Sequence, residues 1–107
     1  MTFRPKLVRD RIPDIIKEAG RSCEYTVMDD QEYECCLLDK LYEEIDEFME
    51  DPCVEEAADI YEVFLTLLSN NHLDLNEVLL VADSKRRTRG GFIERILLKK
   101  IGNECNL

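Results

Sequence analysis

The sequence predicts an all-α fold, an antiparallel helical bundle, and three observations indicate it. Apolar residues recur at helical spacing in the two long segments that flank Pro52. Capping boxes of the D-x-x-E kind begin at Asp29 and at Asp74, where they mark helix starts. Pro52 marks a short turn between the two long segments, so the chain is expected to reverse there into a helical hairpin.

The N-terminal segment is basic in an otherwise acidic protein. Lys6, Arg9 and Arg11 precede Pro13, which is expected to open a short helix that Gly20 ends. These cations either balance the acidic surface or reach a substrate phosphate, since the arginine fork matches phosphate oxygens.

The first long helix is expected to start after Asp29. Glu44 lies at i+7, i+3 and i−4 from Leu37, Leu41 and Phe48, so it belongs to the apolar stripe of this helix. An unpaired ionised carboxylate costs at least several kcal/mol to bury, so such a group is protonated, paired with a cation, or bound to a metal.

The second long helix is expected to run from Val54 to about Ser69, with Asp51 as N-cap and Pro52 at the first helical position. Glu56 is followed at i+4 and i+7 by Ile60 and Val63, so it also lies within an apolar face. Lys and Arg are absent from residues 41 to 84, and we therefore expect no local cation to pair with these carboxylates.

Reflection of the two helices about the turn places Glu47 opposite Glu56 and Glu44 opposite Asp59. Four converging carboxylates provide hard oxygen ligands of the kind that suit Mg²⁺ or Mn²⁺. The alternative is that the acidic run is only a solvated helix face, which is the usual meaning of such a run.

The last third of the chain carries a second basic cluster. A helix is expected from Asp74 to beyond Lys85, with the Lys85 ammonium directed toward the bundle. The cluster at 85–89 either complements the helix dipole or forms the wall of an anion site, and Gly90 ends the helix. Residues 23–28 and 92–100 are the candidates for a minor two-stranded β element.

Length and charge exclude some function classes. A chain of 107 residues suits one small domain, whose inter-helix site is expected to need a second subunit. A net charge of −10 argues against binding to duplex nucleic acid, and no apolar run reaches the ~18 residues typical of a membrane span. The five cysteines lack zinc-type spacing and no secretion signal precedes them, so we expect reduced thiols and a cytoplasmic protein.

Two acidic motifs and two flanking motifs together carry a family resemblance. The acidic motifs are E-E-x-x-E at 43–47 and E-x-x-D at 56–59, and the flanks are KLVRDRIP at 6–13 and K-x-x-x-RGGF at 85–92. The chain resembles, over nearly its full length, the all-α nucleoside triphosphate pyrophosphohydrolase superfamily. That superfamily includes the MazG proteins, dimeric dUTPases and phosphoribosyl-ATP pyrophosphohydrolase, and the flanks resemble a small MazG-like subgroup.

The resemblance implies a single MazG-like domain over residues 1–107 that hydrolyses a nucleoside triphosphate to the monophosphate and pyrophosphate with Mg²⁺. It also implies a bundle completed by oligomerisation, as a homodimer or a tetramer built of dimers. Glu43 would support the site or orient water. The resemblance implies metal ligands at Glu44, Glu47, Glu56 and Asp59, and phosphate contacts at Lys6, Arg9, Lys85 and Arg89.

Two other functions remain open from the sequence. One is a related metal-dependent hydrolase that acts on a different phosphoanhydride, such as phosphoribosyl-ATP. The other is a non-catalytic helical interaction module whose acidic hairpin binds a basic partner. The module would carry its acidic residues on the solvent face only, and the positions of Glu44 and Glu56 in apolar stripes disfavour it.

Overall fold

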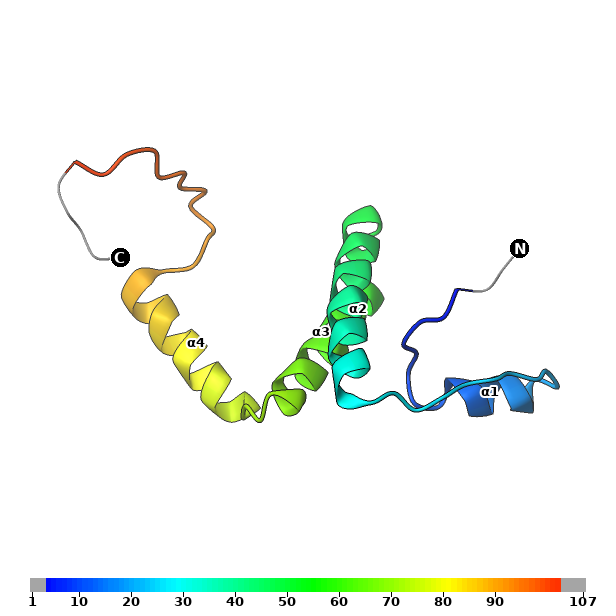
Figure 1. Cartoon of the computed structure of the whole chain (residues 1–107). Coiled ribbons are helices and arrows are strands. Elements are labelled where there is room, and N and C mark those ends of the chain that lie inside the picture. Colours follow the sequence, from blue (N-terminus) through cyan, green and yellow to red (C-terminus); the bar gives the residue numbers. More distant parts are fainter. Residues whose placement is uncertain (1–3, 103–107) are drawn as a thin grey trace. The chain divides into compact units, whose positions relative to one another are not determined.

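A computed structural model of the chain describes residues 4–102, and all the regular structure in this range is helical. Four helices are formed, and no strand occurs among the described residues, so the all-α prediction is confirmed (Figure 1). The chain divides into two compact units, Met1–His72 and Leu73–Leu107, and the expectation of one domain stays a prediction. The helices are α1 (Ile12–Glu18), α2 (Asp30–Glu50), α3 (Val54–Asn70) and α4 (Leu75–Arg89).

The centre of the first unit is the hairpin of α2 and α3, which lie side by side (Figure 1). Leu37 of α2 is only 2% exposed, and Val63 and Leu68 of α3 are also buried. Glu44 is buried together with these apolar side chains, as its position in the stripe predicts. The hairpin therefore holds a carboxylate within its small core.

The helix starts follow the capping boxes. The Asp29 carboxylate accepts a hydrogen bond from the Glu32 backbone N–H at 2.9 Å, and Asp74 accepts one from the Glu77 N–H at 3.3 Å. Each cap satisfies a donor that has no partner within its helix, which stabilises the helix by about 1 kcal/mol. Both predicted starts are confirmed.

The turn between α2 and α3 differs from the prediction. Asp51 is the C-cap of α2, and its backbone N–H donates to the Glu47 carbonyl at 3.1 Å. Cys53 is the N-cap of α3 and makes no side-chain cap hydrogen bond. The prediction of Asp51 as N-cap was wrong because α2 continues to Glu50, which leaves Asp51 to end that helix.

The N-terminal helix α1 has Pro13 in its first turn and no buried residues. Gly20 follows it with a φ of 80°, a left-handed conformation that glycine adopts without strain. The predicted start at the proline and end at the glycine are thus confirmed.

The second unit contains α4 and the segment that follows it. Gly90 ends the helix with a φ of 80°, as predicted, and its N–H donates to the Arg86 carbonyl at 2.9 Å. Neither 23–28 nor 92–100 forms a strand, so the expected minor β element is wrong. In the later segment the chain turns instead of extending, because Arg95 has a φ of 62° and donates back to the Phe92 carbonyl at 3.4 Å.

Two further expectations from the sequence concern the cysteines and helices that could span a membrane. Cys23, Cys35, Cys36 and Cys53 are free thiols, and Cys105 lies outside the described residues. Among the helices of residues 4–102, none combines the length and the apolar character needed to cross a membrane.

Candidate metal centre

Three carboxylates meet between α2 and α3. Glu44, Glu56 and Asp59 each offer one oxygen, and these oxygens all lie within 4.8 Å of one another. Glu44 comes from the second half of α2, whereas Glu56 and Asp59 lie one turn apart near the start of α3. The close approach of Glu44 and Asp59 agrees with the reflection about the turn. The three side chains form a cluster that could bind a metal ion.

Glu47 is the predicted ligand that the structure leaves outside this group. It is exposed, although it is close enough to Glu44 that its charge raises the pKa of that group. Glu47 follows Glu44 by three residues, so it is rotated by about 60° from the face that Glu44 occupies. Its assignment as a fourth ligand stays a prediction.

Two of the three carboxylates have cation partners. The Lys40 ammonium lies 3.2 Å from Oε1 of Glu44, and the Arg9 guanidinium lies 2.6 Å from Oδ1 of Asp59. The expectation that no local cation would pair with these carboxylates was therefore wrong. Lys40 lies just before the stretch without cations, one helical turn from Glu44, and Arg9 comes from the N-terminal segment.

The cations leave part of the cluster unsatisfied. Oε2 of Glu44 and Oε2 of Glu56 are buried and accept no hydrogen bond. No ion pair of Glu56 occurs within the described range, so three carboxylates share two cations. A buried oxygen without a donor is energetically costly, and a bound metal ion would satisfy it.

The surroundings raise the pKa of two of these carboxyl groups above the usual 4.5. For Glu44 the main cause is burial, which the hydrogen bond and charge of Lys40 oppose and the charges of Glu47 and Asp59 reinforce. For Glu56 burial again comes first, followed by the charges of Asp59 and Glu44. Both shifts show that the cluster destabilises negative charge unless further positive charge is present.

A cavity of about 790 Å³ lies beside the cluster and is lined by Glu44 and Asp59. Its walls also include the cations Lys6, Arg9 and Lys40. The lining therefore brings basic residues of the N-terminal segment and the carboxylates of the cluster into one cavity. Two of the predicted phosphate contacts, Lys6 and Arg9, are thus placed beside two of the predicted metal ligands.

The other predicted site residues lie elsewhere. Glu43 is half-buried next to Glu44, and one of its oxygens lies 3.7 Å from the Lys40 ammonium. Lys85 and Arg89 are exposed residues of α4 in the second unit, and their role as phosphate contacts stays a prediction.

The sequence interpretation missed Lys40. This residue is the cation that neutralises the buried Glu44, and it lines the cavity. Its i,i+4 spacing to Glu44 is a signal that could have identified it, because residues four apart are neighbours on a helix.

The chain was also compared with known proteins. No family model, curated protein or solved structure matches it.

Proposed function

We propose that this protein is a Mg²⁺-dependent nucleoside triphosphate pyrophosphohydrolase of the all-α, MazG-like kind. It hydrolyses an NTP or dNTP to the monophosphate and pyrophosphate. The observation that carries this proposal is the group of three carboxylate oxygens within 4.8 Å of one another, two of whose residues line a cavity that Lys6, Arg9 and Lys40 also line. The two acidic motifs that resemble the superfamily contain all three of these carboxylates.

The residues of the cluster fit a hard divalent cation. Glu44, Glu56 and Asp59 supply oxygen ligands only, which is the donor set that Mg²⁺ and Mn²⁺ prefer. The two buried oxygens without hydrogen bonds, one on Glu44 and one on Glu56, are free to act as ligands. When bound, Mg²⁺ supplies charge neutralisation for a polyphosphate and makes a bound water more acidic.

The basic residues of the cavity bind the substrate phosphates in this proposal. Arg9 presents a planar fork that suits phosphate oxygens, and its guanidinium is half exposed, so it can exchange Asp59 for a phosphate. Lys6 and Lys40 also line the cavity and add further positive charge. Glu43 would orient the attacking water, and Lys85 and Arg89 would add phosphate contacts, as the family resemblance implies.

The same proposal includes assembly into a homodimer or a tetramer. Leu38, Tyr42, Ile45 and Met49 recur at i, i+4, i+7 and i+11 on α2, and all four side chains are exposed. A row of this kind is an apolar helix stripe that a second copy of the chain would cover. Light scattering should give a mass of two or four chains at micromolar concentration, and a monomer there would contradict this part.

The test of the activity is pyrophosphate release from canonical and modified nucleoside triphosphates, with Mg²⁺ and then with EDTA. Glu56→Gln removes a cluster charge, whereas Glu55→Gln changes an exposed neighbour outside the cluster. We expect Glu56→Gln to lower Mg²⁺-dependent turnover by at least about 100-fold, since a metal ion supplies several kcal/mol of transition-state stabilisation. Glu55→Gln should retain wild-type turnover.

The outcomes separate the candidate functions. Wild-type turnover in Glu56→Gln at saturating Mg²⁺ would contradict the assignment of this residue as a ligand. No release from any nucleotide, despite saturable Mg²⁺ binding, would favour another phosphoanhydride substrate such as phosphoribosyl-ATP. An absence of both would favour the interaction module, which the buried position of Glu44 makes the weaker alternative.

A further inference from the structure

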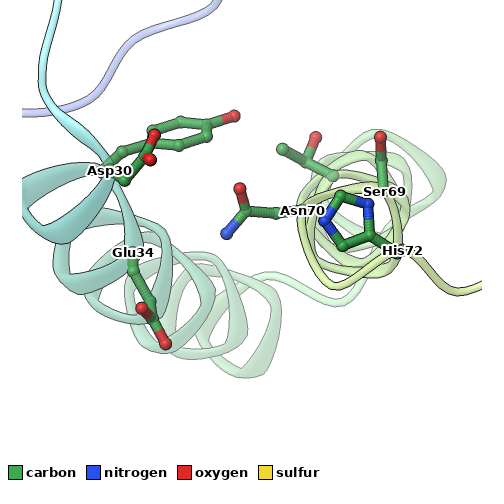
Figure 2. A pocket seen from close by; sticks show the side chains of 7 residues that line it. Asp30, Glu34, Ser69, Asn70 and His72 are labelled. Atoms are coloured by element: carbon green, nitrogen blue, oxygen red, sulfur yellow. The ribbon is translucent and has the colours of Figure 1, made fainter.

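A smaller cavity adjoins the one beside the carboxylate cluster. It has a volume of about 460 Å³ and lies between the start of α2 and the end of α3 (Figure 2). Tyr33 and Thr66 line both cavities, so the two form neighbouring parts of one surface. Both belong to the first unit of the chain.

The two cavities differ in their charged lining, because the larger one combines cations with carboxylates, whereas the smaller one has carboxylates and no Lys or Arg. Lys6, Arg9 and Lys40 line the larger one, whereas no Lys or Arg lines the smaller one. The carboxylates of Asp30 and Glu34, both exposed, line the smaller cavity on the α2 side. A phosphate would be repelled there, so an elongated anionic ligand should place its phosphates in the larger cavity and an uncharged part in the smaller one.

The helix geometry indicates how long such a ligand must be. Glu34 precedes Glu44 by ten residues on α2. At 1.5 Å of rise per residue, this corresponds to about 15 Å along the helix. A compact ion such as pyrophosphate cannot contact both ends, whereas a nucleoside triphosphate is elongated, with its phosphates at one end and its base at the other.

The smaller cavity also offers other hydrogen-bonding groups. Figure 2 shows the Asn70 amide extending from the end of α3 toward the side of the cavity where Asp30 and Glu34 lie, with His72 and Ser69 on the α3 side. An ionised carboxylate only accepts hydrogen bonds, whereas an amide both donates and accepts. The carboxylates on the α2 side therefore favour a ligand that directs a hydrogen-bond donor toward α2.

We propose that the smaller cavity binds the base of the nucleotide and selects a base with an exocyclic amino group, namely cytosine, adenine or guanine. An amino group donates to the Asp30 or Glu34 carboxylate, as it does to Asp and Glu in base recognition. In the orientation that directs the cytosine amino group at a carboxylate, uracil and thymine place a carbonyl oxygen at that position, and the oxygen shares no proton with the carboxylate. This inference rests on the proposed function, whose site it extends.

The most direct test compares CTP with UTP, which differ in the 4-amino group and the N3 proton. We expect the wild-type kcat/KM to be at least about 10-fold higher for CTP than for UTP. This ratio is the effect expected from the loss of one hydrogen bond to a charged group. The double variant Asp30→Asn/Glu34→Gln should reduce this preference to less than about 3-fold, because the new amides also donate to the uracil carbonyl. Asp39→Asn, an exposed change on α2 outside both cavities, should keep it.

A binding experiment separates this inference from the proposed hydrolysis. CMP and UMP are titrated into the wild-type chain without metal, and NMR shifts are followed at Tyr33 and Asn70. Tighter binding of CMP that Asp30→Asn/Glu34→Gln removes supports the base site even if no triphosphate is hydrolysed. Equal kcat/KM for CTP and UTP overturns the base site while leaving the proposed hydrolysis intact, and CMP titration without shifts at these two residues also overturns it.

Discussion

Two ion pairs with the same spacing lie in different surroundings in the two units of the chain. In the first unit Lys40 and Glu44 of α2 are 3.2 Å apart, and their side chains are 19% and 7% exposed. In the second unit Asp83 and Arg87 of α4 are 2.9 Å apart, and their side chains are 56% and 73% exposed. Because the distances are similar, burial is what distinguishes them.

The two ion pairs therefore differ in what they contribute to the stability of the fold. The Asp83–Arg87 pair is solvated, and exposed pairs of this kind contribute about 0.3–0.5 kcal/mol. The Glu44 carboxylate has left water for the hairpin core, where one of its oxygens has no hydrogen bond and its pKa is raised mainly by burial. A small domain retains such a group at the expense of its stability, which is consistent with a binding function.

The largest expected effect on stability comes from truncating a buried leucine of the first unit, compared with an exposed leucine of the second unit. Leu37→Ala removes a side chain that is 2% exposed, and we expect it to lower the free energy of unfolding by about 2–5 kcal/mol. Leu80 of α4 is 70% exposed, so Leu80→Ala should change it by less than about 0.5 kcal/mol. Urea denaturation of both variants measures the difference. Equal losses of the free energy of unfolding would contradict this difference between the units, since they would show that α4 is covered in the assembled protein.

The next largest expected effect is the loss of stability when the cation of each ion pair is removed. Lys40→Met keeps the aliphatic stem but leaves the Glu44 carboxylate without its cation, and we expect a loss of about 1–3 kcal/mol in the presence of EDTA. Arg87→Met, the matched change in α4, should cost less than about 0.5 kcal/mol. Urea denaturation again provides the measurement, and similar costs for the two variants would contradict the importance assigned to burial.

The smallest expected effect is on the pH dependence of stability. The folded protein holds protons on Glu44 and Glu56 more tightly than the unfolded chain, because burial raises both pKa values above 4.5. The free energy of unfolding in EDTA should therefore fall as the pH rises from about 4.5 through the folded pKa values, and level off above them.

The informative quantity is the difference between wild type and Glu44→Gln/Glu56→Gln, because it isolates the contribution of these two groups from that of the rest of the chain. Chemical denaturation between pH 4.5 and 7 should show that the double variant lacks this part of the decrease. Parallel curves for the two proteins would show that burial does not disfavour the charged forms of these groups.

Much of the fold could be predicted because local chemistry determines it. The cap residues Asp29 and Asp74 act within a single helical turn, so their effect is visible in the sequence. The turn was predicted less accurately, since Asp51 could have capped either helix and the length of α2 decided between them. Residues 23–28 have the composition of a strand, but a strand also needs a partner, which composition does not provide.

The candidate site could be predicted to the extent that it follows from helix periodicity. Glu44 was expected to be buried from its stripe, and its approach to Asp59 from the hairpin. The partners of these carboxylates were not predicted, because the position of Arg9 against Asp59 depends on how the N-terminal segment packs across fifty positions of sequence. The smaller cavity also was not predicted, since it forms only where the two helix ends meet.

The most direct test of the carboxylate cluster is the binding of Mg²⁺, measured by calorimetry on the wild-type chain without nucleotide. We predict saturable binding that Glu56→Gln weakens by at least about 10-fold and that Glu55→Gln leaves unchanged, because only the former residue contributes an oxygen to the cluster. An absence of saturable binding, or equal binding by both variants, would contradict the account of this cluster as a metal centre.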